Sequence, residues 1–238
     1  MLISTMYHNI NSDKYSNDFN VFRKHLLYIK ENFSVVLPRE TLEGRKNICL
    51  TFDDSFYNFY EYVFPLLKEL GLKAVLAVPT KFILDDTDVK KEERLNIKHD
   101  DTYTQIQKAP FCTFKELKEM SESGFVKIAS HSHSHVNLLT CKNLDFELQE
   151  SKRILEEKLN INCDTFIFPY GKYNQNIVEK AQKKYKYLFR IGNGINSDFS
   201  GIKGVIYRVN ADNLKDESSI FSFFNIVKYS IKSFIKSF

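Results

Sequence analysis

Residues 48–54 read Ile-Cys-Leu-Thr-Phe-Asp-Asp, a short apolar run that ends on two adjacent acids. The run 48–52 is typical of a buried strand, and the amphipathic segment 57–70 that follows is typical of a helix. This order of strand and then helix recurs along the chain, which predicts a mainly parallel α/β sheet or barrel with helices outside it. In such folds the chemistry gathers at the carboxyl ends of the strands, which is where Asp53 and Asp54 lie.

Several other segments fit the same alternating pattern, and the turn residues between them support the assignment. Thr113 with Glu116 predicts a capping box at the start of a helix, while Gly71 and Gly124 predict helix ends. The other expected strands are 2–7, 34–37, 74–78, 127–129, 165–168, 187–190 and 205–209. The other expected helices are 19–32, 114–123, 145–159 and 175–184.

Length and composition favour one globular domain over residues 1–238. The chain is 43% hydrophobic and 27% charged, without a Pro-, Gly- or Ser-rich linker. A net charge of +4, from 34 basic and 30 acidic residues, is too small to indicate nucleic acid as a partner. Segment 84–110 is charged and aperiodic, so we expect a long surface loop that walls the site.

The cysteines and the first residues bear on the cellular location. The four cysteines form no Cys-x-x-Cys pair, which favours buried free thiols over a metal or redox motif. The first ten residues lack the pattern of a secretory signal, and no run of about 18 apolar residues could span a bilayer. We therefore expect a cytoplasmic protein, with peripheral contact at the inner membrane face as an additional hypothesis.

That hypothesis comes from the last twenty residues, about 219–238. Large apolar residues recur there at helical spacing, three lysines lie opposite them, and no acid follows Glu217. This pattern predicts a basic amphipathic helix. Its apolar stripe could pack on the wall of the domain or dock on an anionic membrane. The apolar residues are Ile220, Phe223, Phe224, Val227, Ile231, Phe234, Ile235 and Phe238, and the lysines are Lys228, Lys232 and Lys236.

Residues 131–135 read His-Ser-His-Ser-His and carry half of the six histidines of the chain. In a helical turn His131 and His135 would face one ion while His133 points away, whereas an extended segment would align all three. Imidazole and carboxylate ligands suit zinc or a neighbouring divalent ion, and three protein ligands leave a position open for water. The paired acids and the histidines therefore indicate a metal site with a base beside it.

The motifs together resemble the polysaccharide deacetylase family, carbohydrate esterase family 4. Its first three motifs are similar to Thr51-Phe52-Asp53-Asp54, to His131-Ser132-x-x-His135-x-x-Leu138, and to Phe168-Pro169-Tyr170-Gly171. Supporting segments are Met6-Tyr7-His8, Phe64-Pro65-Leu66-Leu67 and 117–124. The resemblance covers about residues 2–210, with the motifs in the family's order.

The resemblance implies a distorted (β/α) barrel and metal-dependent removal of an acyl group from an N-acylated sugar. Carried over by position, Asp54, His131 and His135 would bind one divalent metal, with zinc favoured and cobalt, nickel or manganese also compatible. Asp53 would be the general base, and the backbone N–H of Tyr170 would help to hold the oxyanion. Pro169, the neighbour of Tyr170, is assigned to substrate binding.

The chain departs from the family pattern at two places. No histidine follows His135, so the late Leu-x-His that usually protonates the leaving amine is missing. The arginine that often precedes the Pro-Tyr pair is missing too, because the preceding residues 166–168 are Phe-Ile-Phe. We expect either His8 or the protonated Asp53 to supply the acid. Arg208, also assigned to substrate binding, or Arg190 could supply the charge that orients the base.

These assignments predict an N-deacetylase that acts on an amino sugar of a surface glycan, a lipid-linked saccharide or a precursor. One alternative keeps the fold and the metal but removes a formyl or other small acyl group. A second alternative is a carbohydrate-binding protein with a degenerate site, suggested by the missing late histidine. The presence of Asp53 counts against it, since a binder needs no base beside a metal.

Overall fold

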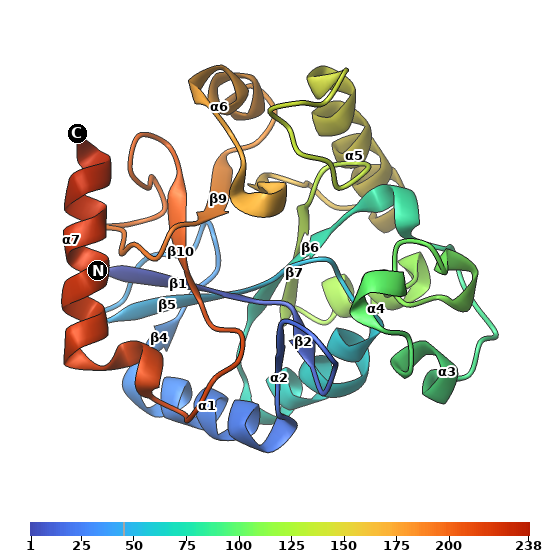
Figure 1. Ribbon diagram of the computed structural model, residues 1–238, viewed down its shortest axis with the longest axis horizontal. Coiled ribbons are helices and arrows are strands. Elements are labelled where there is room, and N and C mark those ends of the chain that lie inside the picture. The colour runs from blue at the N-terminus through green and yellow to red at the C-terminus, as the bar shows by residue number, and fades with distance from the viewer. Residues whose placement is uncertain (45) are drawn as a thin grey trace.

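Seven parallel strands form a closed barrel with helices around it, as seen in a computed structural model that describes residues 1–44 and 46–238 (Figure 1). The strands follow the order β1-β10-β9-β8-β7-β6-β5, and β5 pairs with β1 to close the ring. This confirms the predicted (β/α) barrel. The strands are β1 (Leu2–Tyr7), β5 (Asn47–Phe52), β6 (Ala74–Val78), β7 (Val126–Ser130), β8 (Thr165–Ile167), β9 (Tyr187–Ile191) and β10 (Ile206–Asn210).

β1, the first strand of the chain, lies in the barrel wall between β5 and the last strand, β10. It pairs along its whole length with β5, from Leu2↔Asn47 to Tyr7↔Phe52, and on its other side with β10. The short strand β4 (Ser34–Val35) pairs with the first two residues of β5. A separate two-stranded sheet of β2 (Asn9–Ile10) and β3 (Ser16–Asn17) follows β1. The first and last barrel strands are therefore neighbours.

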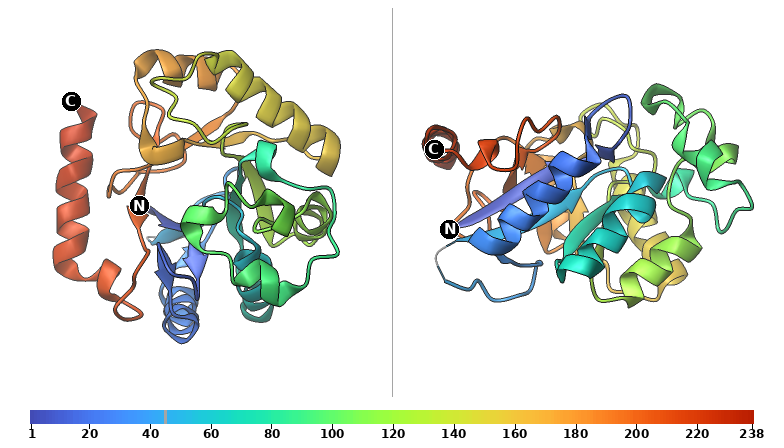
Figure 2. Two further views of the ribbon diagram at one scale, coloured as in Figure 1. Left: turned by 45° about the vertical axis from the view of Figure 1, so that its right-hand side comes forward. Right: turned by 90° about the horizontal axis from the view of Figure 1, so that it is seen from below.

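The helices lie outside the strands, as two further views show (Figure 2). α1 begins at a capped residue, since the Asp18 side chain accepts hydrogen bonds from the N–H groups of Asn20 and Val21. The predicted capping box of Thr113 and Glu116 is present at α4. The helices are α1 (Phe19–Asn32), α2 (Phe64–Leu70), α3 (Lys91–Leu95), α4 (Phe114–Glu122), α5 (Leu144–Leu159), α6 (Gln175–Gln182) and α7 (Phe223–Ser237).

The structure of two segments differs from the prediction. The segment 57–70 is a π-helical turn, Phe59–Val63, followed by α2. Pro65 explains the change, because it lacks the N–H that a continuous α-helix would use there. The segment 84–110 is not one loop, since it contains α3 and two 3₁₀ turns, His99–Asp101 and Ile106–Lys108. The C-terminal helix, expected over about 219–238, begins four residues later as α7, and the remaining predicted strands and helices start and end within about two residues of the observed ones.

The core has two parts, because successive side chains of each strand point alternately into the barrel and toward the helices. On β6, Val75 and Ala77 belong to a cluster that contains no helical residue, so they fill the barrel interior. Ala74, Leu76 and Val78 point the other way and pack beneath the helices. Cys49, Cys112 and Cys163 are buried free thiols as predicted, while Cys141 is half-buried.

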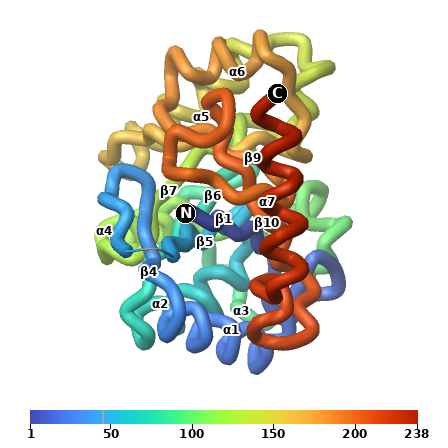
Figure 3. Tube along the Cα trace, turned by 90° about the vertical axis from the view of Figure 1, so that its left-hand side faces the viewer, coloured from blue at the N-terminus to red at the C-terminus, as the bar shows by residue number. Residues whose placement is uncertain are grey.

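The C-terminal helix runs along one side of the molecule, and a view from that side shows α7 in front of the barrel (Figure 3). The 3₁₀ turn Ser219–Phe221 leads into it, and the Phe221 ring stacks on His25 of α1. Among the residues that the structure describes, no helix is both long enough and apolar enough to cross a bilayer. The cytoplasmic location stays a prediction.

Candidate functional site

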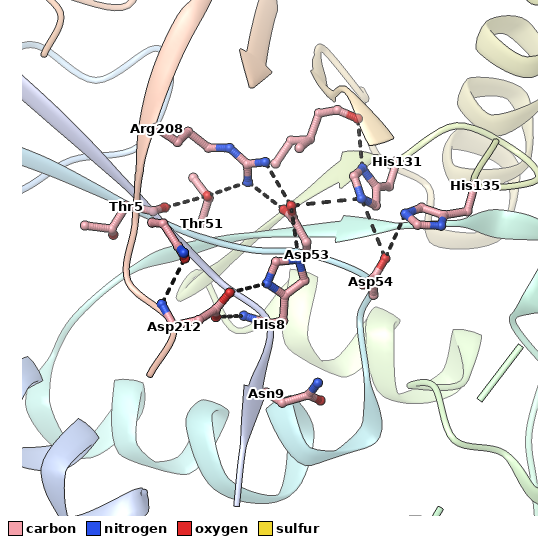
Figure 4. A network of polar contacts seen from close by, with 12 residues as sticks. Thr5, His8, Asn9, Thr51, Asp53, Asp54, His131, His135, Arg208 and Asp212 are labelled. Carbon is pink, nitrogen blue, oxygen red and sulfur yellow. Dashed lines mark hydrogen bonds and ion pairs between the residues drawn. The ribbon is translucent and has the colours of Figure 1, made fainter. Parts of the chain in front are cut away.

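The carboxyl ends of six of the seven barrel strands surround a cavity of about 640 Å³, with β9 represented by Ile191. His8 follows β1, Asp53 and Asp54 follow β5, and His131 follows β7 (Figure 4). β10 contributes Arg208, and the turn after β8 contributes Tyr170. The structure thus gathers at one rim the polar residues that the sequence places at separate strand ends.

Asp54, His131 and His135 form a compact set of three donors. One ligand atom from each lies within 4.8 Å of the others, and Asp54 Oδ1 is 3.2 Å from His135 Nε2 and 3.6 Å from His131 Nε2. The Nδ1 atom of His131 lies 2.8 Å from the carbonyl oxygen of Ile167, which turns Nε2 toward Asp54. Burial lowers the pKa of His135 to about 4, so its ring is neutral at neutral pH. A carboxylate and two imidazoles suit a divalent cation.

The two histidines converge through a loop rather than through a helical turn or a strand. Residues 131–137 form neither helix nor strand, and Ser132 and His135 have φ angles of 63° and 48°. Asp54 and Tyr170, with φ angles of 67° and 55°, share this left-handed conformation. Each such non-glycine residue costs on the order of 1 kcal/mol or more, and such strain tends to cluster at functional sites. The cluster of left-handed residues around Asp54 and His135 therefore supports the assignment of this rim as a functional site.

Asp53 is buried and makes a bidentate ion pair with Arg208. The two carboxylate oxygens accept hydrogen bonds from the guanidinium at 2.6 and 2.8 Å, and Arg208 also donates to Thr51 Oγ1 at 2.9 Å. Burial alone would raise the pKa of Asp53, but the Arg208 charge holds that pKa well below its usual range. The carboxylate is thus ionised at neutral pH. Each oxygen still has a lone pair that Arg208 does not use.

His8 lies on the other side of Asp53 and is held by Asp212. The Asp212 carboxylate accepts a hydrogen bond from the backbone N–H of His8 at 3.0 Å and lies 2.8 Å from its Nδ1. The Nε2 atom of His8 is 3.9 Å from Asp53 Oδ2. Burial disfavours the charged ring, but the neighbouring Asp212 carboxylate outweighs it and raises the pKa of His8 to about 9. The ring is therefore protonated at neutral pH.

Tyr103 reaches the same group of residues from segment 84–110. Its hydroxyl donates to Asp54 Oδ1 at 2.8 Å, and its ring stacks on His135 with centroids 5.2 Å apart. Burial and the Asp54 charge raise the pKa of Tyr103 well above its ordinary value, so the hydroxyl stays a donor. With His99 and Asp100 on the cavity wall, the segment does border the site as expected.

The other predicted residues lie at varying distances from this centre. His133 is outside the three-donor set, with Nδ1 3.0 Å from Thr80 Oγ1 and its ring against Phe146. Tyr170 lines the cavity, whereas Pro169 is buried and is not among the described residues of the cavity wall. Arg190 does not orient Asp53, because its guanidinium lies over the rings of Tyr173 and Tyr207.

Sequence reasoning missed Asp212 and Tyr103. Asp212 lies two residues beyond the end of β10, so the strand-end rule that selected Asp53 could have selected it too. Tyr103 has no comparable signal, because it lies in an irregular segment and reaches Asp54 only through the folding of residues 84–110.

Comparisons with known proteins agree with this geometry. The model of the polysaccharide deacetylase family matches residues 42–188, more than half of the chain. YxkH of Bacillus subtilis, whose name places it among the polysaccharide deacetylases, is 25% identical over 193 residues, covering 75% of this chain and 60% of its own. The poly-β-1,6-N-acetyl-D-glucosamine N-deacetylase of Escherichia coli O157:H7 is 24% identical over 237 residues, covering 81% of this chain and 34% of its own. The chain thus spans between a third and three fifths of these relatives.

Solved structures share the fold. A Streptococcus pyogenes deacetylase, PplD, in complex with acetate superposes with a TM-score of 0.74 and 22% identity, covering 96% of this chain and 97% of its own. A polysaccharide deacetylase from Bacillus cereus superposes with a TM-score of 0.77 and 18% identity, covering 94% of this chain and 68% of its own. At these identities the likeness concerns the fold.

Proposed function

The chain belongs to the polysaccharide deacetylase family, and we propose that it is a metal-dependent hydrolase that removes the N-acetyl group from an amino sugar of a glycan. One observation carries the proposal: an ionised carboxylate, Asp53, and a protonated imidazole, His8, lie 3.9 Å apart beside a three-donor metal set. Amide hydrolysis needs a group that accepts a proton from water and another that gives one to the amine.

Asp54, His131 and His135 would hold the metal, since their donor atoms suit zinc or a similar divalent ion. Such an ion supplies a Lewis acid beside the scissile amide. The Ile167 carbonyl and the Tyr103 hydroxyl each contact one of the three side chains and orient it, as outer contacts at metal sites do.

Asp53 accepts the proton of the attacking water as the new C–O bond forms. Arg208 keeps the carboxylate ionised and fixes its plane, so that a free lone pair can face the cavity. Arg208 would thus position the base and would not contact the sugar, which differs from its expected role in substrate binding. The backbone N–H of Tyr170 donates to the amide oxygen as negative charge develops on it.

His8 gives its Nε2 proton to the leaving nitrogen as the C–N bond breaks. Acetate and the free amine are then released, and Asp53 returns its proton to solvent while His8 takes one up. Asp212 keeps Nε2 directed into the cavity by holding Nδ1. The barrel supports this role for a residue so early in the chain, because β1 lies between β5, which carries Asp53, and β10.

The names of the relatives and the size of the cavity support a proposal for the substrate class. The E. coli relative is named for poly-β-1,6-N-acetyl-D-glucosamine, and a cavity of about 640 Å³ is in the range that encloses a small ligand. We propose an N-acetylglucosamine unit within a surface glycan, a lipid-linked saccharide or a precursor of one.

The proposal is tested by measuring the acetate and formate released from a panel of N-acylated substrates by the metal-loaded protein. The panel contains β-1,6- and β-1,4-linked N-acetylglucosamine oligomers, nucleotide and lipid-linked N-acetyl sugars, and their N-formyl counterparts. We expect acetate from an oligomer or a lipid-linked sugar. Formate release alone would support the deformylase alternative. Binding without release of either acid would support a degenerate carbohydrate-binding protein.

A further inference from the structure

Helix α7 packs on the barrel through the face opposite its apolar stripe, which the sequence pattern had suggested would face solvent. Tyr229 is buried, and the Ser233 hydroxyl accepts a hydrogen bond from the backbone N–H of Ile195 at 2.7 Å. The Lys236 ammonium lies 5.0 Å from the centroid of the Tyr207 ring. Together with half-buried Ile226, these residues form the inner face of the helix. The last helix therefore packs on the wall of the domain, as one of the two alternatives held, but it does not do so through its apolar stripe.

The apolar stripe of α7 faces outward instead. At about 100° per residue its side chains fall within an arc of about 120°. Phe224 is 84% exposed and Phe223 76% exposed, values typical of surface lysines rather than of phenylalanines. The arc consists of Phe223, Phe224, Val227, Ile231, Phe234 and Ile235.

This surface is concentrated on one helix. These six make up half of the twelve large apolar side chains exposed in the described part of the chain, and Phe238 adjoins them. The others are separate, and two of them, Tyr15 and Tyr170, border the catalytic cavity. A contiguous apolar surface of this kind marks a site of interaction.

The charges beside the arc indicate what covers it. Lys228 and Lys232 follow the arc along one edge of the helix, and no acid lies between Glu217 and the last residue. Apolar side chains of this kind enter the boundary between headgroups and acyl chains, while lysines at the edge meet the phosphates. We propose that the outer face of α7, defined by the six arc residues, docks on the surface of a membrane rich in anionic lipid. This inference does not depend on the proposed reaction.

The absence of tryptophan from the chain allows a direct test. In Phe224→Trp the single indole reports on the arc alone. On adding vesicles of phosphatidylcholine and phosphatidylglycerol we expect a blue-shifted emission that brominated acyl chains quench. Leu139→Trp is the matched control, because Leu139 is 46% exposed but lies away from α7, and its emission should not change. Emission from Phe224→Trp that is unaltered by the vesicles would overturn the proposal.

Co-sedimentation with the same vesicles provides a second measurement. We expect Phe223→Ser/Phe234→Ser/Ile235→Ser to bind at least about tenfold more weakly than the unsubstituted protein, with an unchanged thermal unfolding curve because these side chains are exposed. Lys228→Glu should also weaken binding, whereas Lys24→Glu on α1 should not. Wild-type binding by the triple variant would overturn the proposal. The proposal would also be overturned if the unsubstituted protein were a dimer, the triple variant were a monomer and neither bound vesicles. In that case a second copy of the chain would cover the arc.

Discussion

Two side chains on one side of the barrel set the charge of the site. Arg208 comes from within β10 and Asp212 from just beyond its end, and the first contacts Asp53 while the second contacts His8. Each supplies the charge opposite to that of its partner, so the base is kept ionised and the acid is kept protonated. Arg208 of β10 thereby supplies the charge that the resemblance placed before the Pro-Tyr pair, and Asp212 adds a partner for His8.

The pKa of His8 predicts how the reaction rate falls at alkaline pH, which is the alkaline limb of the pH–rate profile. Because a proton donor acts only while protonated, kcat/KM should be maintained below the pKa of about 9 and fall as the pH rises through it. His8→Ala should lower turnover by about 100-fold or more and abolish this limb.

His99→Ala is the matched control, since His99 lines the same cavity but is not the partner of Asp212. It should keep the alkaline limb. Full activity of His8→Ala across the pH range would instead leave Asp53 as both base and acid.

Removing Arg208 should destabilise the fold in a pH-dependent way. Arg208→Gln leaves the buried Asp53 carboxylate without its cation, so we expect a loss of roughly 3–5 kcal/mol in the free energy of unfolding at pH 7. In the wild type this contribution is complete above the ordinary aspartate range and is lost only as the pH falls toward the depressed pKa of Asp53, whereas in the variant burial raises that pKa with less opposition, so the carboxyl is protonated and its penalty relieved at a higher pH. Urea denaturation at pH 7 and pH 4 should show a smaller difference between wild type and variant at the lower pH.

The matched change is Arg190→Gln, which removes a guanidinium from the rings of Tyr173 and Tyr207. It should cost about 1 kcal/mol, with little dependence on pH in this range. Equal losses for the two variants at pH 7 would contradict the assigned role of Arg208.

At the scale of elements, the loop after β7 decides which histidines join Asp54 in the three-donor set. Its backbone turns through left-handed conformations at Ser132 and His135, which bring two imidazoles to Asp54 and send His133 toward Thr80. Spacing alone could not select this arrangement, because the helical and extended alternatives both assume a regular backbone.

This geometry predicts the metal content of three alanine variants. His131→Ala and His135→Ala should lose most of the bound ion, because two protein ligands hold a divalent cation far more weakly than three. His133→Ala is the matched control and should keep one ion per chain. Elemental analysis after gel filtration measures each. Full occupancy in either of the first two variants would remove that histidine from the site.

Elements were predictable where local pattern and tertiary packing agree. β1, β6 and α1 match their expected bounds, since the two strands are short runs buried throughout and the helix is amphipathic with one buried face. The π-helical turn before α2 needed the effect of Pro65, and the orientation of α7 could not be read from periodicity. An amphipathic pattern shows that a helix has two faces but not which of them meets the domain.

At the scale of the whole molecule, closure of the barrel brings His8 to the position that our proposal needs in the absence of a late histidine. Because β1 pairs with both β5 and β10, a residue at the end of the first strand lies as near to Asp53 as one at the end of the last. His8 can therefore stand where the resemblance expects a residue from the end of the sequence. The sequence suggested His8 as the acid, but the contact with Asp212 that protonates it depends on closure.

The central claim is that Asp53 is a base beside a metal that it does not bind. Its most direct test is the acetate release rate of Asp53→Asn, measured with the metal content of the same sample. Since asparagine leaves Arg208 without a counter-charge, Asp53→Asn/Arg208→Gln is measured alongside. For both variants we predict one ion per chain and a rate lowered by about 100-fold to 10,000-fold. Undiminished release from metal-loaded Asp53→Asn would contradict the account.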